Sequence, residues 1–483
     1  MKAALRLNAP PPCVQSAHPV AVALEPHILT PMDQTSAPTP PQVPLVTEAW
    51  GVLRSLSAAR RNILELIPEI ALRQPIVSGK MGRPWHMVMD PTALRRILLE
   101  EVENYPKSDV TKNILRPAIG ESLFVAEGAH WRWQRRAAAP VFTHRNIANL
   151  APIMSAATDR SCARIAANVG RGADLYQEMM TAAFEVISDV TFSGDEQFDR
   201  AAVHRAVDGY IDQSAKVSLF DLFALPAWIP RPSRVLSSGA MKQMKQMSNS
   251  VIDARREKEP SDIPDLLDLL LAGEDPKTKR AMNTDELRDN LLTFIVAGHE
   301  TTALTLSWAL YVCAFDEGVQ GKLRAEAQSV LNDRTAGAED LPNLPYTRAV
   351  IDETLRLYPP AAFLSRTAQK ADMLCDRKIA KGDTVTLPIY ALHRSHLLWD
   401  DPHQFNPDRF LGEAPVDRYA YLPFGDGPRI CIGASFAIQE AVIMLATIVS
   451  RFKFTRIKGK DPKPVLILTL RPEGGVWLNV EEA

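Results

Sequence analysis

The chain has 483 residues and a formal charge of −2, with 46% hydrophobic and 23% charged residues, as in a soluble globular protein. This balance argues against nucleic acid as the main partner, because nucleic-acid binding needs a concentrated basic surface. Five cysteines lie far apart with no Cys-x-x-Cys pair, which argues against a disulfide framework, zinc or an iron–sulfur cluster and indicates a reducing, cytoplasmic compartment.

The N-terminal region, residues 1–47, contains 10 of the 37 prolines and no glycine. This composition predicts an extended or poorly ordered arm. Its longest apolar run, "VAVAL" at 20–24, is far shorter than the roughly 20 residues of a membrane-spanning helix. We therefore expect no transmembrane anchor.

Residues 48–483 read as one large domain, mainly α with a small β region. Apolar residues recur at helical spacing over most of this range, while short alternating runs typical of strands occur chiefly near the C-terminus. We expect helices at 50–72, 90–101, 151–169, 175–192, 241–259 and 284–315, and strands at 85–89, 378–392, 452–457 and 464–480.

A tryptophan- and arginine-rich stretch, "GAHWRWQRRAAAPVF", spans 128–142. Trp131 and Arg135 are four residues apart, so they share one face of a helix. Arg132 and Arg136 are expected on a solvated basic face. Together with His144 and Arg145 they form a hypothetical docking patch for an acidic electron donor.

The longest helical pattern, 284–315, is apolar nearly all round and is expected to cross the protein interior. It contains "AGHETT" at 297–302. Thr301 and Thr302 can donate to carbonyls one turn earlier and loosen the helix. Gly298 leaves space beside the helix, and Glu300 next to Thr301 supplies an acid and an alcohol for proton transfer. Alone, this pattern is more often structural.

Two further stretches carry a predicted charge network. In "DETLRLYPP" (352–360), Glu353 and Arg356 share a helical face, and the prolines end the helix. Exposed pairs of this kind contribute little, but the apolar neighbours indicate a buried helix. "FNPDRF" (405–410) offers Arg409 as a third member.

A single cysteine, Cys431, sits in the glycine-rich stretch "LPFGDGPRICIGASFAIQEAV" (422–442), before an apolar helical run. A thiolate there can bind iron, and the following helix start favours negative charge on sulfur. Gly425 and Gly427 permit a tight loop, and Gly433 leaves room for a flat cofactor. For a cysteine alone, a buried inert thiol is the commoner outcome.

The pattern Phe-x-x-Gly-x-Arg-x-Cys-x-Gly resembles the haem-thiolate signature of the cytochrome P450 family, and the resemblance extends over about 50–483. It implies Cys431 as the iron ligand of haem b, in the single haem domain of the cytochrome P450 fold. It also implies cofactor contacts from Phe424, Gly433, Trp131, Arg135, Arg366 and Arg429, catalytic roles for Gly298, Glu300 and Thr301, and a folding role for Glu353, Arg356 and Arg409.

The resemblance further implies a monooxygenase that inserts one oxygen atom of O2 into a hydrophobic substrate. Electrons would come from NAD(P)H through a separate ferredoxin and its reductase, and the protein would be a monomer. A peroxide-driven or isomerising haem-thiolate enzyme and a non-catalytic haem binder remain alternatives. His299 is a candidate for the proton relay, although a lone histidine more often satisfies local hydrogen bonds.

The substrate pocket is expected to be apolar, and fatty acids, terpenoids, steroids and aromatics all stay open as substrates. The resemblance places its walls at the loop around 108–124, the long helix, "AAFL" (361–364) and the turn at 471–476. The individual residues implied are Phe294, Ile295, Ala297, Phe363 and Leu364.

Overall fold

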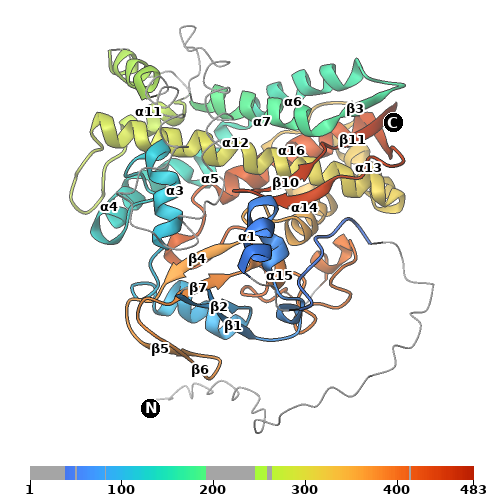
Figure 1. Cartoon of the computed structure of the whole chain (residues 1–483). Helices are drawn as coiled ribbons and strands as arrows, with labels where there is room; N and C mark the ends of the chain where they lie inside the picture. The colour runs from blue at the N-terminus through green and yellow to red at the C-terminus, as the bar shows by residue number, and fades with distance from the viewer. Residues whose placement is uncertain (1–38, 49–51, 82, 192–244, 258–263, 413–414) are drawn as a thin grey trace, which may run out of the picture.

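A computed structural model describes residues 39–48, 52–81, 83–191, 245–257, 264–412 and 415–483 (Figure 1). Its centre is the 32-residue helix α12 (Thr284–Phe315), whose bounds match the predicted interior helix. Asn283 and Glu286 form a capping box at its start. Most of its side chains are buried, because α7, α14 and α16 pack around it.

The helices account for most of the described chain, and those predicted at 151–169 and 175–192 are present as α6 and α7. The other well-defined helices flank α12 or the cofactor-facing loops. Besides α12, the α-helices whose bounds lie within the described residues are α1 (Val52–Arg61), α2 (Pro91–Arg95), α3 (Asp109–Ile119), α4 (Gly128–Ala138), α5 (His144–Asn149), α6 (Ala151–Ala166), α7 (Leu175–Thr191), α11 (Leu266–Leu271), α13 (Glu317–Leu331), α14 (Pro345–Leu357), α15 (Ile389–Leu392) and α16 (Ala434–Arg451).

Four predicted elements differ from the structure. The strand expected over 378–392 is two short strands, Arg377–Ile379 and Thr384–Leu387, followed by the helix α15. The helix expected over 50–72 ends at Arg61, because the Asn62 side chain caps a 3₁₀ turn and Pro68 begins another. The helix expected over 90–101 begins at the Asp90 cap but continues from Arg96 as a π-helical turn. Residues 241–244 and 258–259 of the expected 241–259 helix lie outside the described residues, and 245–256 are helical.

The β region is small, as predicted, and the strands of the described residues form four separate sheets. The largest has the order β1-β2-β7-β4, in which β2 and β7 are parallel and the other pairs antiparallel. Its members are β1 (Ile76–Met81), β2 (Arg83–Val88), β7 (Thr384–Leu387) and β4 (Leu364–Thr367); the others are β3 (Gly172–Asp174), β5 (Asp372–Leu374), β6 (Arg377–Ile379), β8 (Phe452–Arg456), β9 (Lys463–Leu466), β10 (Leu470–Glu473) and β11 (Trp477–Glu482).

The end of the proline-rich arm packs against the folded domain. The Val43 N–H donates to the Tyr390 hydroxyl at 3.1 Å, and the Tyr358 hydroxyl donates to the Pro41 carbonyl at 2.8 Å. Tyr358 in turn stacks on Trp308 of α12, with ring centroids 3.9 Å apart. Residues 39–48 are thus tied to the core, whereas 1–38 lie outside the described residues.

Within the described ranges, α16 alone has the length and apolar composition of a membrane-crossing helix. It is largely buried between α6, α13 and α14 and carries core residues along its whole length. The apolar side chains of α16 therefore pack in the hydrophobic core.

Candidate active site

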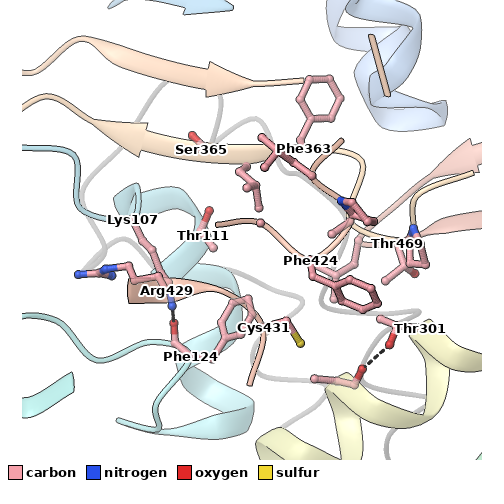
Figure 2. Close-up of a pocket in the computed structure, with 18 of the residues that line it drawn as sticks. Lys107, Thr111, Phe124, Thr301, Phe363, Ser365, Phe424, Arg429, Cys431 and Thr469 are labelled. Atoms are coloured by element: carbon pink, nitrogen blue, oxygen red, sulfur yellow. Dashed lines mark hydrogen bonds between the residues drawn. The ribbon is translucent and has the colours of Figure 1, made fainter. Parts of the chain in front are cut away.

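A cavity of about 1960 Å³ lies between α12, the loop that carries Cys431, and the sheet formed by β1, β2, β7 and β4. Small-molecule sites usually measure about 300–1,000 Å³, so this space can hold a large cofactor together with a substrate. In Figure 2, Cys431 and Thr301 face the cavity from the cysteine loop and from α12, and Phe424 lies beside the sulfur.

A glycine and a backbone hydrogen bond fix the position of the loop that carries Cys431. Gly427 has φ of +69°, and a Cβ there would stand 2.0 Å from the Leu98 carbonyl oxygen, so a larger residue cannot fit. The Cys431 N–H donates to the Phe424 carbonyl at 2.9 Å. These constraints present the sulfur to the cavity.

The surroundings of the Cys431 thiol act in opposite directions on its ionisation. Burial raises the pKa of the thiol, while the Gly433 N–H and the nearby Arg135 lower it. No protein atom lies within 4 Å of the position that a Gly433 Cβ would take, and Gly433 lines the cavity. The loop therefore leaves open space beside a sulfur that has a backbone donor, as the predicted flat cofactor requires.

Four cations lie at one end of the cavity, and the carboxylate of Glu127 is beside them. Lys107, Arg366, Arg429 and Arg135 affect one another electrostatically, and Glu127 pairs with Arg429. Burial and then repulsion by Arg429 lower the pKa of Lys107 to about 7 and that of Arg366 to about 10. Several like charges that are shielded from water are stable only with anionic partners.

Arg429 shows most directly what the cation cluster lacks. Its Nε and Nη1 atoms are buried and have no hydrogen-bond partner among the described residues, and its guanidinium lies 4.9 Å from the Trp131 ring centre. Two carboxylates on the edge of a flat group would supply acceptors for these donors. The site therefore fits a haem, with Cys431 toward the iron and the cation cluster toward the propionates.

Lys107 is the member that the sequence analysis missed. It lies in the short link before α3, its backbone N–H donates to Glu127 at 2.9 Å, and its ammonium group donates to the Phe124 carbonyl (Figure 2). The lysine belongs to no motif used above, so only the folded arrangement places it beside Arg366 and Arg429.

The α12 wall of the cavity contains Gly298, Glu300 and Thr301. The Thr301 hydroxyl donates to the Ala297 carbonyl at 2.8 Å, yet α12 stays α-helical throughout, so the expected loosening is absent. The space predicted beside Gly298 is narrowed by α7, because Ile187 Cδ1 would lie 3.3 Å from a Cβ at this position.

Glu300 is 1% exposed and is bound by the strand β10 and the turn before it. Its Oε1 accepts from the Thr469 hydroxyl at 2.8 Å and from Arg471 Nε at 2.6 Å. The acid and the alcohol predicted at 300 and 301 thus both line the cavity, but each has a hydrogen-bond partner elsewhere.

The predicted charge network is assembled and fully buried at its centre. All five N–H groups of Arg356 are used: they reach both Glu353 oxygens at 2.6 and 2.8 Å and the carbonyls of His393, Pro402 and Gln404 at 2.7–2.9 Å. Arg409 adds a contact to Glu353 Oε1 at 3.1 Å.

His393 links this network to the cysteine loop. Its Nδ1 hydrogen-bonds the Arg356 carbonyl at 3.1 Å, and its Nε2 accepts from the Leu422 N–H at 2.9 Å. Burial and the neighbouring Arg356 lower the pKa of His393 to about 3, so the ring is neutral under ordinary conditions. The network therefore reaches the segment that ends in Cys431.

Four of the five predicted pocket residues line the cavity: Phe294, Ala297, Phe363 and Leu364. Ile295 does not, because the turn of α12 directs it into the hydrophobic core, where it is 1% exposed. The wall expected at 471–476 is instead the turn 466–469, which precedes β10. The expected loop at 108–124 is largely the helix α3, which contributes Thr111 and Leu115.

Two other predictions concern residues outside the cavity. His299 is buried beside Phe184 of α7, with ring centroids 5.7 Å apart, and is not among the cavity-lining residues, which removes the support for a relay role. Arg132 pairs with Glu103, and Arg136 pairs with the buried Asp275 at 2.6 Å. The Arg132 side chain is 49% exposed and that of Arg136 is 33% exposed, so both lie at the surface as expected, but each is paired with a carboxylate.

A buried acid on α16 was also missed by the sequence analysis. Glu440 is 2% exposed, receives a hydrogen bond from Thr302 of α12, and has no partner for Oε1 among the described residues. Burial raises its pKa to about 8. The sequence around Glu440 is an apolar helical run, and nothing in it indicates that this acid faces another helix.

Comparison with known proteins gives a consistent result. The model of the family Cytochrome P450 matches residues 41–479. Cyclooctatin synthase of Streptomyces melanosporofaciens is 30% identical (85% of this chain, 90% of that protein), and the cyclooctat-9-en-7-ol 5-monooxygenase of the same organism is 31% identical (89% and 94%). A cytokinin hydroxylase of Arabidopsis thaliana is 34% identical over 76% of this chain and 72% of its own length.

Among solved structures, the haem domain of cytochrome P450DA superposes with a TM-score of 0.74 at 24% sequence identity, over 85% of this chain and 90% of that domain. At this identity the likeness concerns the fold. It agrees with the predicted architecture of a mainly α domain with a small β region.

Proposed function

The chain belongs to the cytochrome P450 family of haem-thiolate monooxygenases, and from that premise we propose that it oxygenates a large, mainly hydrophobic, alkene-containing compound with electrons from a separate ferredoxin. The balanced reaction is RH + O2 + NAD(P)H + H⁺ → ROH + NAD(P)⁺ + H2O. The proposal includes haem b as the cofactor, a ferredoxin reductase, a monomeric enzyme and a cytoplasmic location.

The cavity is the observation that carries the substrate class. Beyond the part that fits a haem, its walls are largely apolar, with Ile114, Leu115, Phe294, Phe363 and Ile467 among them. A relative's name, cyclooctat-9-en-7-ol 5-monooxygenase, denotes an enzyme that acts on an alkene alcohol. Both support a bulky substrate with few polar groups.

Each group of residues has a distinct part in the proposed reaction. Haem bound at Cys431 would supply a thiolate-ligated iron that binds and activates dioxygen. Lys107, Arg366 and Arg429 would hold and neutralise its carboxylates, and Phe424 would limit access of water to the sulfur. Glu300 and Thr301 would accept hydrogen bonds from water at the α12 wall and so position the water that carries protons toward the oxygen site.

A spectroscopic and kinetic experiment tests this proposal. Reduced, CO-bound protein should show the absorption band of thiolate-ligated haem, and Cys431→Ala should lack it. With a surrogate ferredoxin and reductase, NAD(P)H should then drive product formation from apolar alkenes. Product formed with peroxide alone, or redox-neutral isomerisation, would replace the monooxygenase proposal. A thiolate band without turnover of any substrate would indicate a haem binder.

Thr301→Ala should separate reductant consumption from product formation. Without the hydroxyl, protons reach the oxygen site less selectively, and two electrons and two protons convert O2 to H2O2. We expect the yield of product per NAD(P)H to fall about tenfold or more, within the range of positioned proton-transfer groups, while H2O2 rises in proportion. Thr293→Ala, on the same helix, is the control, and unchanged coupling in Thr301→Ala would contradict the proton-transfer role.

A further inference from the structure

Three threonine hydroxyls on the α12 side of the cavity donate their hydrogens to backbone carbonyls of the helix. Thr293, Thr301 and Thr305 each donate to the carbonyl four residues earlier, at 2.7, 2.8 and 2.9 Å. All three line the cavity. A carbonyl oxygen can only accept, so the direction of each hydrogen bond is fixed. These threonines therefore have only lone pairs to offer to a ligand.

A fourth cavity-lining threonine, Thr469, lies in the turn between β9 and β10 and has the same arrangement. Its hydroxyl lies 2.8 Å from Glu300 Oε1, and the carboxylate is also bound by Arg471. The Thr469 hydroxyl is the donor in this contact, and Glu300 Oε1 accepts from both Thr469 and Arg471. The oxygen of Thr469 is left with free acceptor capacity at the wall of the cavity that Figure 2 shows.

Two hydrogen bonds of the neighbouring residue, Leu470, hold the turn that carries Thr469 and so fix the position of this acceptor. The Trp308 indole N–H of α12 donates to the Leu470 carbonyl at 3.1 Å, and the Leu470 N–H donates to the Pro360 carbonyl at 3.1 Å. Pro360 itself lines the cavity. A fixed acceptor among apolar side chains discriminates strongly, because a ligand that desolvates it without donating a hydrogen bond loses free energy.

We propose that Thr469 is a specificity-determining residue that selects, among hydrophobic ligands, those that carry a hydroxyl group as hydrogen-bond donor. The substrate hydroxyl donates to Thr469 Oγ1, while the hydrocarbon body fills the apolar part of the cavity. This inference rests on the proposed function and narrows it: the substrate is a hydrophobic alcohol, and oxygen is inserted elsewhere on its skeleton.

The Glu300–Arg471 pair acts through Thr469 in this arrangement. It fixes the hydroxyl hydrogen away from the cavity, so that Thr469 cannot serve equally well as a donor to ketones or ethers. Thr469→Val removes the acceptor while Glu300 keeps its contact with Arg471. The buried carboxylate is thus not left without a partner, and the variant should fold.

Binding of matched ligand pairs to haem-loaded protein, without reductant, tests the proposal. The panel consists of farnesol, geranylgeraniol, cedrol and cholesterol, each with its O-methyl ether, which lacks the donor. Dissociation constants come from calorimetric titration. At least one wild-type alcohol should bind about tenfold more tightly than its ether. Thr469→Val should remove that preference, Thr469→Ser should restore it, and Thr386→Val, on another wall, should keep it.

Three results would overturn the proposal: no alcohol preferred over its ether in the wild type, a preference that survives in Thr469→Val, or one lost equally in Thr386→Val. These results are independent of turnover. If the alcohols bind selectively through Thr469 but no oxygenated product forms with reductant, the assignment of the ligand class stands and the proposed oxygenation fails.

Discussion

Replacing Arg356 by alanine should abolish haem loading and unfold the region around the cysteine loop. The substitution leaves Glu353 as a fully buried carboxylate with Arg409 as its remaining cation, and removes donors from three backbone carbonyls. Removing one member of a buried ion pair costs about 3–5 kcal/mol, a large share of the usual 5–15 kcal/mol of folding stability. The ratio of haem to protein and the urea unfolding midpoint measure the effect.

Arg348→Ala is the matched control, because it removes an arginine from the same helix. Arg348 also pairs with a carboxylate one turn away, Asp352, but its side chain is 49% exposed. Asp352 is largely buried but keeps the hydrogen bond from the Tyr421 hydroxyl, and the lost arginine is solvent-exposed, so this variant should load haem normally. Equal losses in the two variants, or normal haem loading in Arg356→Ala, would contradict a special role for the buried network and its link through His393 to Leu422.

The elements with strong periodicity were predictable from the sequence, and α12 is the best example. Its capping box and long apolar run fix both ends. The small β region was also predicted, since alternating runs at 452–457 and 464–480 became β8 and the strands β9 to β11. The long helix over 50–72 was wrong, because the Asn62 cap and Pro68 end it. Such local turn chemistry overrides apolar spacing.

Parts of the site that depend on several distant segments could not be predicted in this way. Motif spacing placed Glu300 beside Thr301 in sequence, but the hydrogen-bond partner of Glu300 is Thr469, 169 residues away. Lys107 joins Arg366 and Arg429 only through the fold. The direction of Ile295 differs from that of Phe294 because successive side chains on a helix point about 100° apart.

Glu440→Gln should stabilise the protein increasingly as the pH rises. The folded state holds the Glu440 proton up to about pH 8, whereas an ordinary glutamate ionises near 4.5. Below pH 4.5 both folded and unfolded chains are protonated, so the wild type has no penalty there. Above pH 4.5, ionisation of Glu440 in the unfolded chain lowers the free energy of unfolding of the wild type by about 1.4 kcal/mol per pH unit until about pH 8.

The variant should therefore exceed the wild type by roughly 3 kcal/mol at pH 7, and by more at pH 8.5, with little difference near pH 4.5. Urea unfolding of haem-loaded protein across this range measures it. Glu481→Gln, an exposed residue of β11, should show no such pH dependence. A stability difference that stays constant from pH 5 to 8.5 would mean that Glu440 ionises alike in both states. The α12–α16 contact would then enclose water rather than a protonated acid, because an ionised carboxylate needs solvation where Oε1 meets no protein donor.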